Sequence, residues 1–151
     1  MIFLVILLII GINVSKDRSN ANSNISRSSI LLVDDDADIS KLLEESLLRS
    51  GFKVSAFTDP IMALQDFKVN CKTCGLVLSD VRMPGMNGYE LAKQAKQIDR
   101  DAKVVLMTAF EINEKEFQNL LPDIKIDGFI QKPFTLEKIN ELVKGIITRA
   151  N

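Results

Sequence analysis

Histidine and tryptophan do not occur in this chain of 151 residues, and only two of its residues are cysteine. Without histidine, a His-ligated metal site and a Ser-His-Asp triad are both excluded, which removes most zinc enzymes and serine hydrolases. The chain has no block of basic residues and a formal net charge of −1, so no nucleic-acid partner is expected. The length suits a single domain with a proper hydrophobic core.

The two cysteines, Cys71 and Cys74, have the spacing of a CxxC motif. A thioredoxin-like redox pair would open a helix after a strand, whereas this pair lies in a connection that precedes a predicted strand. Half of a zinc site is an alternative, but this chain lacks the other half. We interpret the pair as loop thiols in a reducing cytosol.

Residues 1–14, MIFLVILLIIGINV, form an uncharged hydrophobic run followed by Lys16 and Arg18. The run is shorter than the about 20 apolar residues that cross a bilayer, and it lacks the basic start and the cleavage site of a secretory signal. The alternatives are a short membrane anchor, an upstream translated stretch without a structural role, and a weak signal peptide; we favour the first two. If the run inserts, the cations after it place the remainder in the cytoplasm.

Residues 15–28 are polar and rich in serine and asparagine, which is typical of a flexible linker. We expect the folded domain at residues 29–150, where strand and helix patterns alternate. The predicted strands are 30–33, 52–56, 75–79, 103–107 and 126–130, and the predicted helices begin near residues 36, 60, 89, 112 and 135. Such alternation without hairpin signals predicts a parallel sheet with helices on both faces.

Hydrophobic periodicity predicts the buried face of each helix. For the first three helices the expected buried residues are Ile39, Leu42, Leu43 and Leu47, then Ile61, Leu64 and Phe67, then Leu91, Ala95 and Ile98. The helix of residues 112–120 is expected to end before Pro122. For the last helix, 135–148, the expected buried residues are Leu136, Ile139, Leu142, Val143, Ile146 and Ile147.

Residues that could form a site follow four of the predicted strands, among them three carboxylates, one hydroxyl and one ammonium. They are Asp34 and Asp35 after the first strand, Asp80 after the third, Thr108 and Ala109 after the fourth, and Lys132 and Pro133 after the fifth. Ligands of open α/β sheets bind at the carboxyl ends of the strands, so these residues should converge. Three carboxylates at one point repel each other unless a cation lies among them, which predicts a Mg²⁺ site.

This set of side chains suits phosphoryl transfer to a carboxylate. One Asp would be the nucleophile, Mg²⁺ would offset the negative charges, and a lysine and a hydroxyl would contact the phosphoryl oxygens. The neighbouring Asp36 is more simply explained as the N-cap of the first helix.

Four motifs occur in order: VDDD at 33–36, LSDVRMPGMNGYEL at 78–91, MTAF at 107–110 and GFIQKPF at 128–134. With these motifs, residues 29–150 resemble the receiver domain of two-component response regulators. The resemblance implies an α/β, flavodoxin-like (βα)5 doubly wound sandwich of the CheY-like type. Its five-stranded parallel sheet would have the order 2-1-3-4-5.

The resemblance also implies a metal site and a phosphoacceptor. Asp80 would accept the phosphoryl group and contribute to the metal site. Asp35 would ligate Mg²⁺ directly, Asp34 would hold it through water, and the backbone carbonyl of Arg82 would be a further ligand.

Further roles are implied for residues around the phosphoryl group. Thr108 would turn its hydroxyl toward it, Lys132 would pair with one of its oxygens, and backbone amides near Arg82 and Ala109 would complete its binding site. The Lys132–Pro133 bond would be cis. Thr108 and Phe129 would form the conformational switch, although a core phenylalanine is an alternative for Phe129.

The implied function is a phosphorylation-dependent signalling switch in the cytoplasm, tethered to the membrane if residues 1–14 insert. A histidine kinase or a histidine phosphotransfer protein would supply the phosphoryl group. A downstream effector protein would then bind a surface made by residues 112–120, 126–130 and 135–148. Because the last predicted helix ends close to Asn151, we expect a stand-alone receiver with no output domain.

Two alternatives remain. A receiver that serves as a phosphorelay intermediate or a phosphate sink would have the same motifs. A phosphatase of the haloacid-dehalogenase type also uses Mg²⁺ and a strand-end Asp, and Asp34-Asp35-Asp36 superficially fits its Asp-x-Asp start. The chain lacks the second acidic pair and the cap insertion of such phosphatases. We therefore expect a signalling domain whose only chemistry is its own phosphorylation and dephosphorylation.

Overall fold

The computed structural model describes residues 27–109, 115, 119 and 122–149. Outside residues 110–121, its strands and helices alternate along the chain, as predicted. The elements are β1 (Ser29–Val33), α2 (Ala37–Arg49), β2 (Lys53–Phe57), α3 (Pro60–Asn70), β3 (Cys74–Asp80), α4 (Gly88–Ile98), β4 (Val104–Thr108), β5 (Gly128–Gln131) and α6 (Leu136–Arg149). Of the predicted helix at 112–120 the structure describes only Lys115 and Asn119, both as helical. The run at 1–14 and nearly all of the predicted linker lie outside the described residues.

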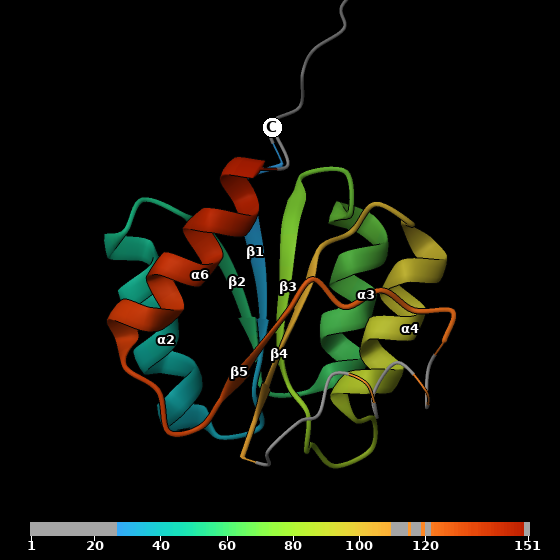
Figure 1. Ribbon diagram of the computed structural model, residues 1–151, viewed down its shortest axis with the longest axis horizontal. Helices are drawn as coiled ribbons and strands as arrows, with labels where there is room; N and C mark the ends of the chain where they lie inside the picture. Colours follow the sequence, from blue (N-terminus) through green and yellow to red (C-terminus); the bar gives the residue numbers. More distant parts are fainter. Residues whose placement is uncertain (1–26, 110–114, 116–118, 120–121, 150–151) are drawn as a thin grey trace, which may run out of the picture.

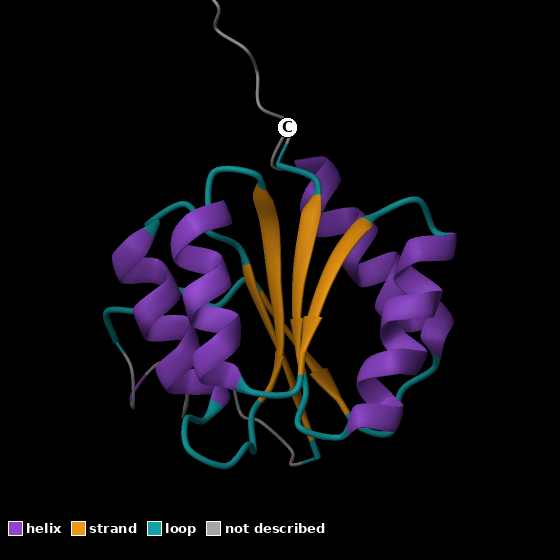
Figure 2. Ribbon diagram, turned by 180° about the vertical axis from the view of Figure 1, so that it is seen from behind, coloured by secondary structure: helices purple, strands orange, loops and turns teal. Residues whose placement is uncertain are grey.

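The strands form one parallel sheet in the order β2-β1-β3-β4-β5, which confirms the predicted order (Figure 1). Helices cover both faces, with α2 and α6 on one and α3 and α4 on the other (Figure 2). β3 and β4 are buried along their whole length, as expected of apolar strands covered on both faces. β2 lies at an edge of the sheet, as the predicted order requires, and is partly exposed.

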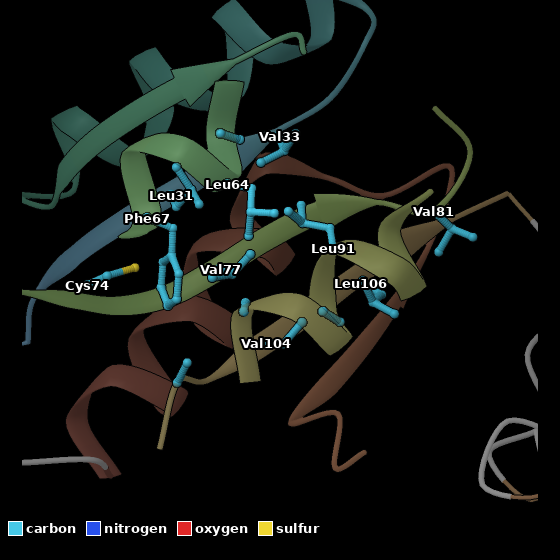
Figure 3. Close-up of a cluster of buried hydrophobic side chains, with 14 residues drawn as sticks. Leu31, Val33, Leu64, Phe67, Cys74, Val77, Val81, Leu91, Val104 and Leu106 are labelled. Carbon is cyan, nitrogen blue, oxygen red and sulfur yellow. The ribbon is translucent and has the colours of Figure 1, made fainter. Parts of the chain in front are cut away.

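Each face of the sheet has its own hydrophobic core. Leu31 and Val33 of β1 belong to the first core, under α3 and α4 (Figure 3), whereas Ile30 and Leu32 belong to the second core, under α2 and α6. Successive side chains of a strand point to opposite faces, which is why β1 contributes to both cores.

Local sequence explains where the helices begin. The Asp36 carboxylate accepts hydrogen bonds from the backbone N–H groups of Asp38 at 3.0 Å and Ile39 at 3.2 Å, so it caps α2 as predicted. Asp59 caps α3 in the same way, and Pro60 occupies the first helical position.

Three predicted core residues are exposed, and these predictions were wrong. Leu42 is 52% exposed, Ile61 49% and Ile98 36%. Leu42 lies beside the row of buried residues on α2, and the sheet covers only that row. Ile61 is in the first turn of α3 and Ile98 is the last residue of α4, so both lie at helix ends where less of the sheet covers them.

The cysteine prediction was partly wrong. Both thiols are free, but Cys74 is the first residue of β3 and is buried, whereas Cys71 is the half-buried C-cap residue of α3.

Within the described part of the chain, no helix has the length and apolar character needed to cross a membrane.

Candidate functional site

The parallel sheet brings the predicted acidic residues together at one edge. Val33 of β1 is opposite Ser79 of β3, so Asp34 and Asp80 follow at the same level on neighbouring strands. Each of Asp34, Asp35 and Asp80 offers a carboxylate oxygen, and the three oxygens lie within 4.8 Å of one another. The expected cluster of three carboxylates is therefore present in the fold.

Lys132 lies between two of these carboxylates. Its Nζ is 3.1 Å from Oδ2 of Asp34 and 3.1 Å from Oδ1 of Asp80. The lysine follows β5, and its backbone N–H donates to the carbonyl oxygen of Thr108 at 2.6 Å. The Lys132–Pro133 peptide bond is cis, as expected. One ammonium thus offsets part of the negative charge of the three acids.

Burial and charge act against each other at this site. Burial raises the pKa of Asp34 above its ordinary value, although the Asp36 backbone N–H and Lys132 both act to lower it. Burial also acts to lower the pKa of Lys132, but hydrogen bonds and Coulombic attraction from Asp34 and Asp80 outweigh burial, so this pKa is raised. The lysine stays charged, whereas the charge on Asp34 is costly.

The structure places the other predicted site residues on β4, on β5 and in the segments that follow β3 and β4. Thr108 ends β4 and is buried, and the exposed Ala109 follows it at the same edge of the sheet. Arg82 is exposed in the loop after β3. Phe129 is half-buried within β5, opposite Leu106, and packs against the first core. This position also fits the alternative of a core phenylalanine.

The donor set fits a Mg²⁺ ion. Magnesium takes oxygen ligands at 2.0–2.1 Å in an octahedral arrangement, which sets neighbouring oxygens about 3.0 Å apart and opposite oxygens about 4.2 Å apart. Carboxylate oxygens that already lie within 4.8 Å of one another need only small movements to reach these separations. Two of the three acids are buried, so a cation there would relieve charges that water does not solvate.

Sequence reasoning missed the role of Gly88, the first residue of α4. A Cβ atom at this position would lie 2.3 Å from the backbone oxygen of Asp80, and the Gly88 N–H donates to the oxygen of Val81 at 2.9 Å. The start of α4 therefore packs directly on the backbone of Asp80. The glycine lies within the motif LSDVRMPGMNGYEL at 78–91, in which no role was assigned to it.

Comparison with known proteins identifies the family. The family model of the response regulator receiver domain matches residues 30–144. The chain belongs to this family. Receiver domains are the signalling domains of two-component response regulators rather than ordinary enzymes, and the flavodoxin-like fold predicted from the sequence is confirmed.

Curated relatives of this receiver domain include one protein of similar length and several longer proteins. The response regulator receiver protein CpdR of Brucella abortus is 33% identical over 120 residues, which cover 78% of this chain and 96% of CpdR. The alkaline phosphatase synthesis transcriptional regulatory protein PhoP of Bacillus subtilis is 33% identical over 122 residues, which cover 80% of this chain and 49% of PhoP. Other curated relatives are also longer, and the chain spans between 21% and 56% of their length.

A solved receiver structure resembles this one in fold and sequence. The response regulator TrrA of Thermotoga maritima, in complex with Mg(2+)-BeF, has a TM-score of 0.68 and 29% identity. The match covers 79% of this chain and 98% of TrrA. A relative of this receiver domain is therefore known with magnesium bound.

Proposed function

We propose that this receiver domain accepts a phosphoryl group on Asp80 and thereby acts as a switch in a two-component system. The observation that supports the proposal is the cluster at the sheet edge. Three carboxylates lie within 4.8 Å of one another, and one lysine ammonium lies 3.1 Å from two of them. This arrangement suits a transfer in which negative charge accumulates beside a carboxylate nucleophile.

Asp80 is a better nucleophile than Asp34 on geometric grounds. Oδ1 of Asp34 accepts a hydrogen bond from the Asp36 backbone N–H at 3.0 Å and Oδ2 pairs with Lys132, so both oxygens are engaged. The Asp34 side chain is also only 1% exposed. The Asp80 side chain is 10% exposed, and its contact with Lys132 uses only Oδ1. This difference also weakens the phosphatase alternative, in which Asp34 would be the nucleophile.

In the proposed reaction, Oδ2 of Asp80 attacks the phosphorus of a phosphohistidine on a kinase or phosphotransfer protein. The O–P bond forms, the N–P bond breaks, and the departing imidazole takes up a proton. Lys132 counters the charge on the phosphoryl oxygens, and the Thr108 hydroxyl and the Ala109 backbone N–H donate hydrogen bonds to them. Bound Mg²⁺, held by Asp34, Asp35, Asp80 and the Arg82 carbonyl, would supply positive charge for these oxygens.

The proposed output is a change of surface. Thr108 moves toward the phosphoryl group, and Phe129 takes up the space that this movement opens. A downstream effector then binds the altered surface formed around β5, α6 and residues 112–120. Because the donor is a phosphohistidine protein of a two-component system, we place this domain in the cytoplasm.

Acetyl phosphate labelling tests the acceptor. The full chain, incubated with Mg²⁺ and acetyl phosphate, should gain the mass of one phosphoryl group, whereas Asp80→Asn should gain none. Removal of Mg²⁺ with a chelator should abolish the label. Asp59→Asn is the matched control, because Asp59 is an exposed helix cap and asparagine caps equally well. It should be labelled like the wild type.

The opposite pattern would reject the proposal. A label that persists in Asp80→Asn and disappears in Asp34→Asn would identify Asp34 as the nucleophile and favour the phosphatase chemistry. Two-way phosphoryl exchange with a histidine phosphotransfer protein would instead identify a phosphorelay intermediate that still uses Asp80.

A further inference from the structure

Charge is unevenly distributed along the strand direction of this domain. At the carboxyl ends of the strands lie the buried Asp34 and Asp80 and five exposed acids near the first turns of helices, Asp35, Asp36, Asp38, Asp59 and Glu137. At the opposite edge, where strands begin and helices end, Arg49 is exposed and pairs with Glu45 at 3.9 Å, and six further cations are exposed there. These six residues, which we call the basic edge, are Lys53, Lys68, Lys72, Arg100, Lys125 and Arg149.

The basic edge is not neutralised by neighbouring acids. Asp99 pairs with Arg27, and Asp127 pairs with Lys96 at 3.0 Å and with Lys103 at 3.4 Å. Within the part of the chain that the structure describes, none of the six cations of the basic edge takes part in an ion pair. Asp66, which lines a pocket with Lys53, and the exposed Asp101 and Asp123 are also acids near this edge, and the exposed cations outnumber them.

Exposed aliphatic side chains lie at the same edge. Leu48 is in the last turn of α2, Val69 in the last turn of α3, and Ile98 ends α4, with exposures of 49%, 81% and 36%. These three helices all end at the basic edge because every strand of the sheet is parallel (Figure 1). Cations interspersed with exposed aliphatic groups suit the headgroup region of an anionic membrane.

The connection of the chain to the domain favours a membrane over other anionic partners. The described part starts at Arg27, immediately before β1, and so at the basic edge (Figure 1). Residues 1–14 form the hydrophobic run, and Lys16 and Arg18 follow it. A run of this length is too short to span a bilayer, and stable attachment generally takes two weak signals, such as an apolar segment and a polybasic surface.

We propose that the basic edge, together with Leu48, Val69 and Ile98, rests on an anionic lipid surface and supplies the second signal beside residues 1–14. In this orientation the acidic site faces away from the membrane. β3 runs from Cys74 at the basic edge to Asp80, so roughly 20 Å separates the lipid from the acid cluster. A phosphodonor in the aqueous phase can then reach Asp80. The proposal itself does not depend on phosphoryl transfer at Asp80.

Vesicle sedimentation tests this surface. The full chain should bind vesicles of phosphatidylcholine with added phosphatidylglycerol more tightly than vesicles of phosphatidylcholine alone, and added salt should weaken the difference. The double variant Lys68→Glu, Lys72→Glu should lose at least about 25-fold in partitioning to the anionic vesicles, since each lost cation near such a surface is worth about fivefold. A matched control is Lys41→Glu, Lys138→Glu, which makes the same charge change near the opposite edge and should stay close to the wild type.

The half-buried Cys71 gives a second readout, because it lies in the chain between Lys68 and Lys72. Anionic vesicles should slow its alkylation in the wild type and leave the rate unchanged in Lys68→Glu, Lys72→Glu. Equal binding to both kinds of vesicle, unchanged in that variant, would show that the hydrophobic run acts alone and would overturn the proposal. Absence of binding, or equal losses in both double variants, would also overturn it.

Discussion

At the scale of single residues, Cys71 and Cys74 differ although only two residues separate them. Cys74 is 5% exposed, and its Sγ lies 3.4 Å from the backbone oxygen of Leu76. Burial raises the pKa of the Cys74 thiol to about 11. Cys71 is half-buried and caps the end of α3. The CxxC spacing therefore joins one buried thiol of a strand to one accessible thiol, which is not the arrangement of a redox pair.

Alkylation should distinguish the two thiols. At pH 8 only about one in a thousand Cys74 thiols is ionised, and the thiolate is the reactive form. We expect the folded protein to gain one iodoacetamide adduct, at Cys71, and the protein in urea to gain two. The variant Cys71→Ser should stay unmodified until it unfolds. Equal rates at the two cysteines in the folded protein would contradict this assignment.

The burial of Cys74 also makes the free energy of unfolding depend on pH, and the sign of this dependence follows from the direction of the pKa shift. The folded-state pKa of Cys74 is above its ordinary value of 9.0, so between about pH 9 and pH 11 the folded state binds more protons than the unfolded state. The stabilisation from the neutral buried thiol is present below pH 9 and is lost as the pH rises through 11, by roughly 3 kcal/mol. Urea unfolding of the wild type should show this loss, and Cys74→Ala should lack it.

At the scale of secondary-structure elements, glycine has two different roles in helices. Gly145 is inside α6, and a Cβ atom there would meet nothing within 4 Å. Gly88 begins α4, and a Cβ atom there would lie 2.3 Å from the backbone oxygen of Asp80, which cannot move without displacing the end of β3. A side chain is therefore tolerated at Gly145 of α6 but not at Gly88 of α4.

Two alanine substitutions should have opposite signs. Gly145→Ala should raise the free energy of unfolding by about 0.5–1 kcal/mol, because alanine loses less conformational entropy in a helix. Gly88→Ala should lower it by about 1–3 kcal/mol through overpacking and should slow acetyl phosphate labelling at Asp80. Urea denaturation measures both free energies. A Gly88→Ala protein as stable as the Gly145→Ala protein would refute the close packing of α4 on Asp80.

At the scale of the whole molecule, packing decides which positions of an amphipathic helix are buried. Leu42 and Leu43 are neighbours on α2, and both belong to the apolar stripe in the sequence. Leu43 is 1% exposed in the second core, whereas Leu42 is 52% exposed. Only the row of residues that faces the sheet lies in the core, and that row is narrower than the apolar stripe.

Truncation of each leucine should show this difference. Leu43→Ala should lower the free energy of unfolding by about 2–5 kcal/mol, because it leaves a cavity in the second core. Leu42→Ala should change it by less than about 0.5 kcal/mol. Thermal or urea unfolding of the two variants provides the comparison. Similar losses from both would mean that Leu42 is covered in solution.

Much of the fold could be predicted from the sequence because its signals are local. Strand and helix periods, the caps Asp36 and Asp59, and the acids Asp34 and Asp80 at strand ends all depend on residues close in the chain. The carboxyl ends of parallel strands lie at one edge of the sheet, so the sequence was enough to predict that residues at these ends converge. The roles of Thr108, Arg82, Ala109 and Phe129 remain predictions that follow from the family.

Only the tertiary structure decided the features that depend on residues distant in the chain. The exposure of Leu42 and Ile98, the burial of Cys74 and the contact of Gly88 with Asp80 follow from how the helices pack on the sheet. The basic edge is of this kind as well, because its cations are scattered in sequence. Since every strand is parallel, the fold gathers these cations at one edge and the acids Asp34, Asp35 and Asp80 at the other.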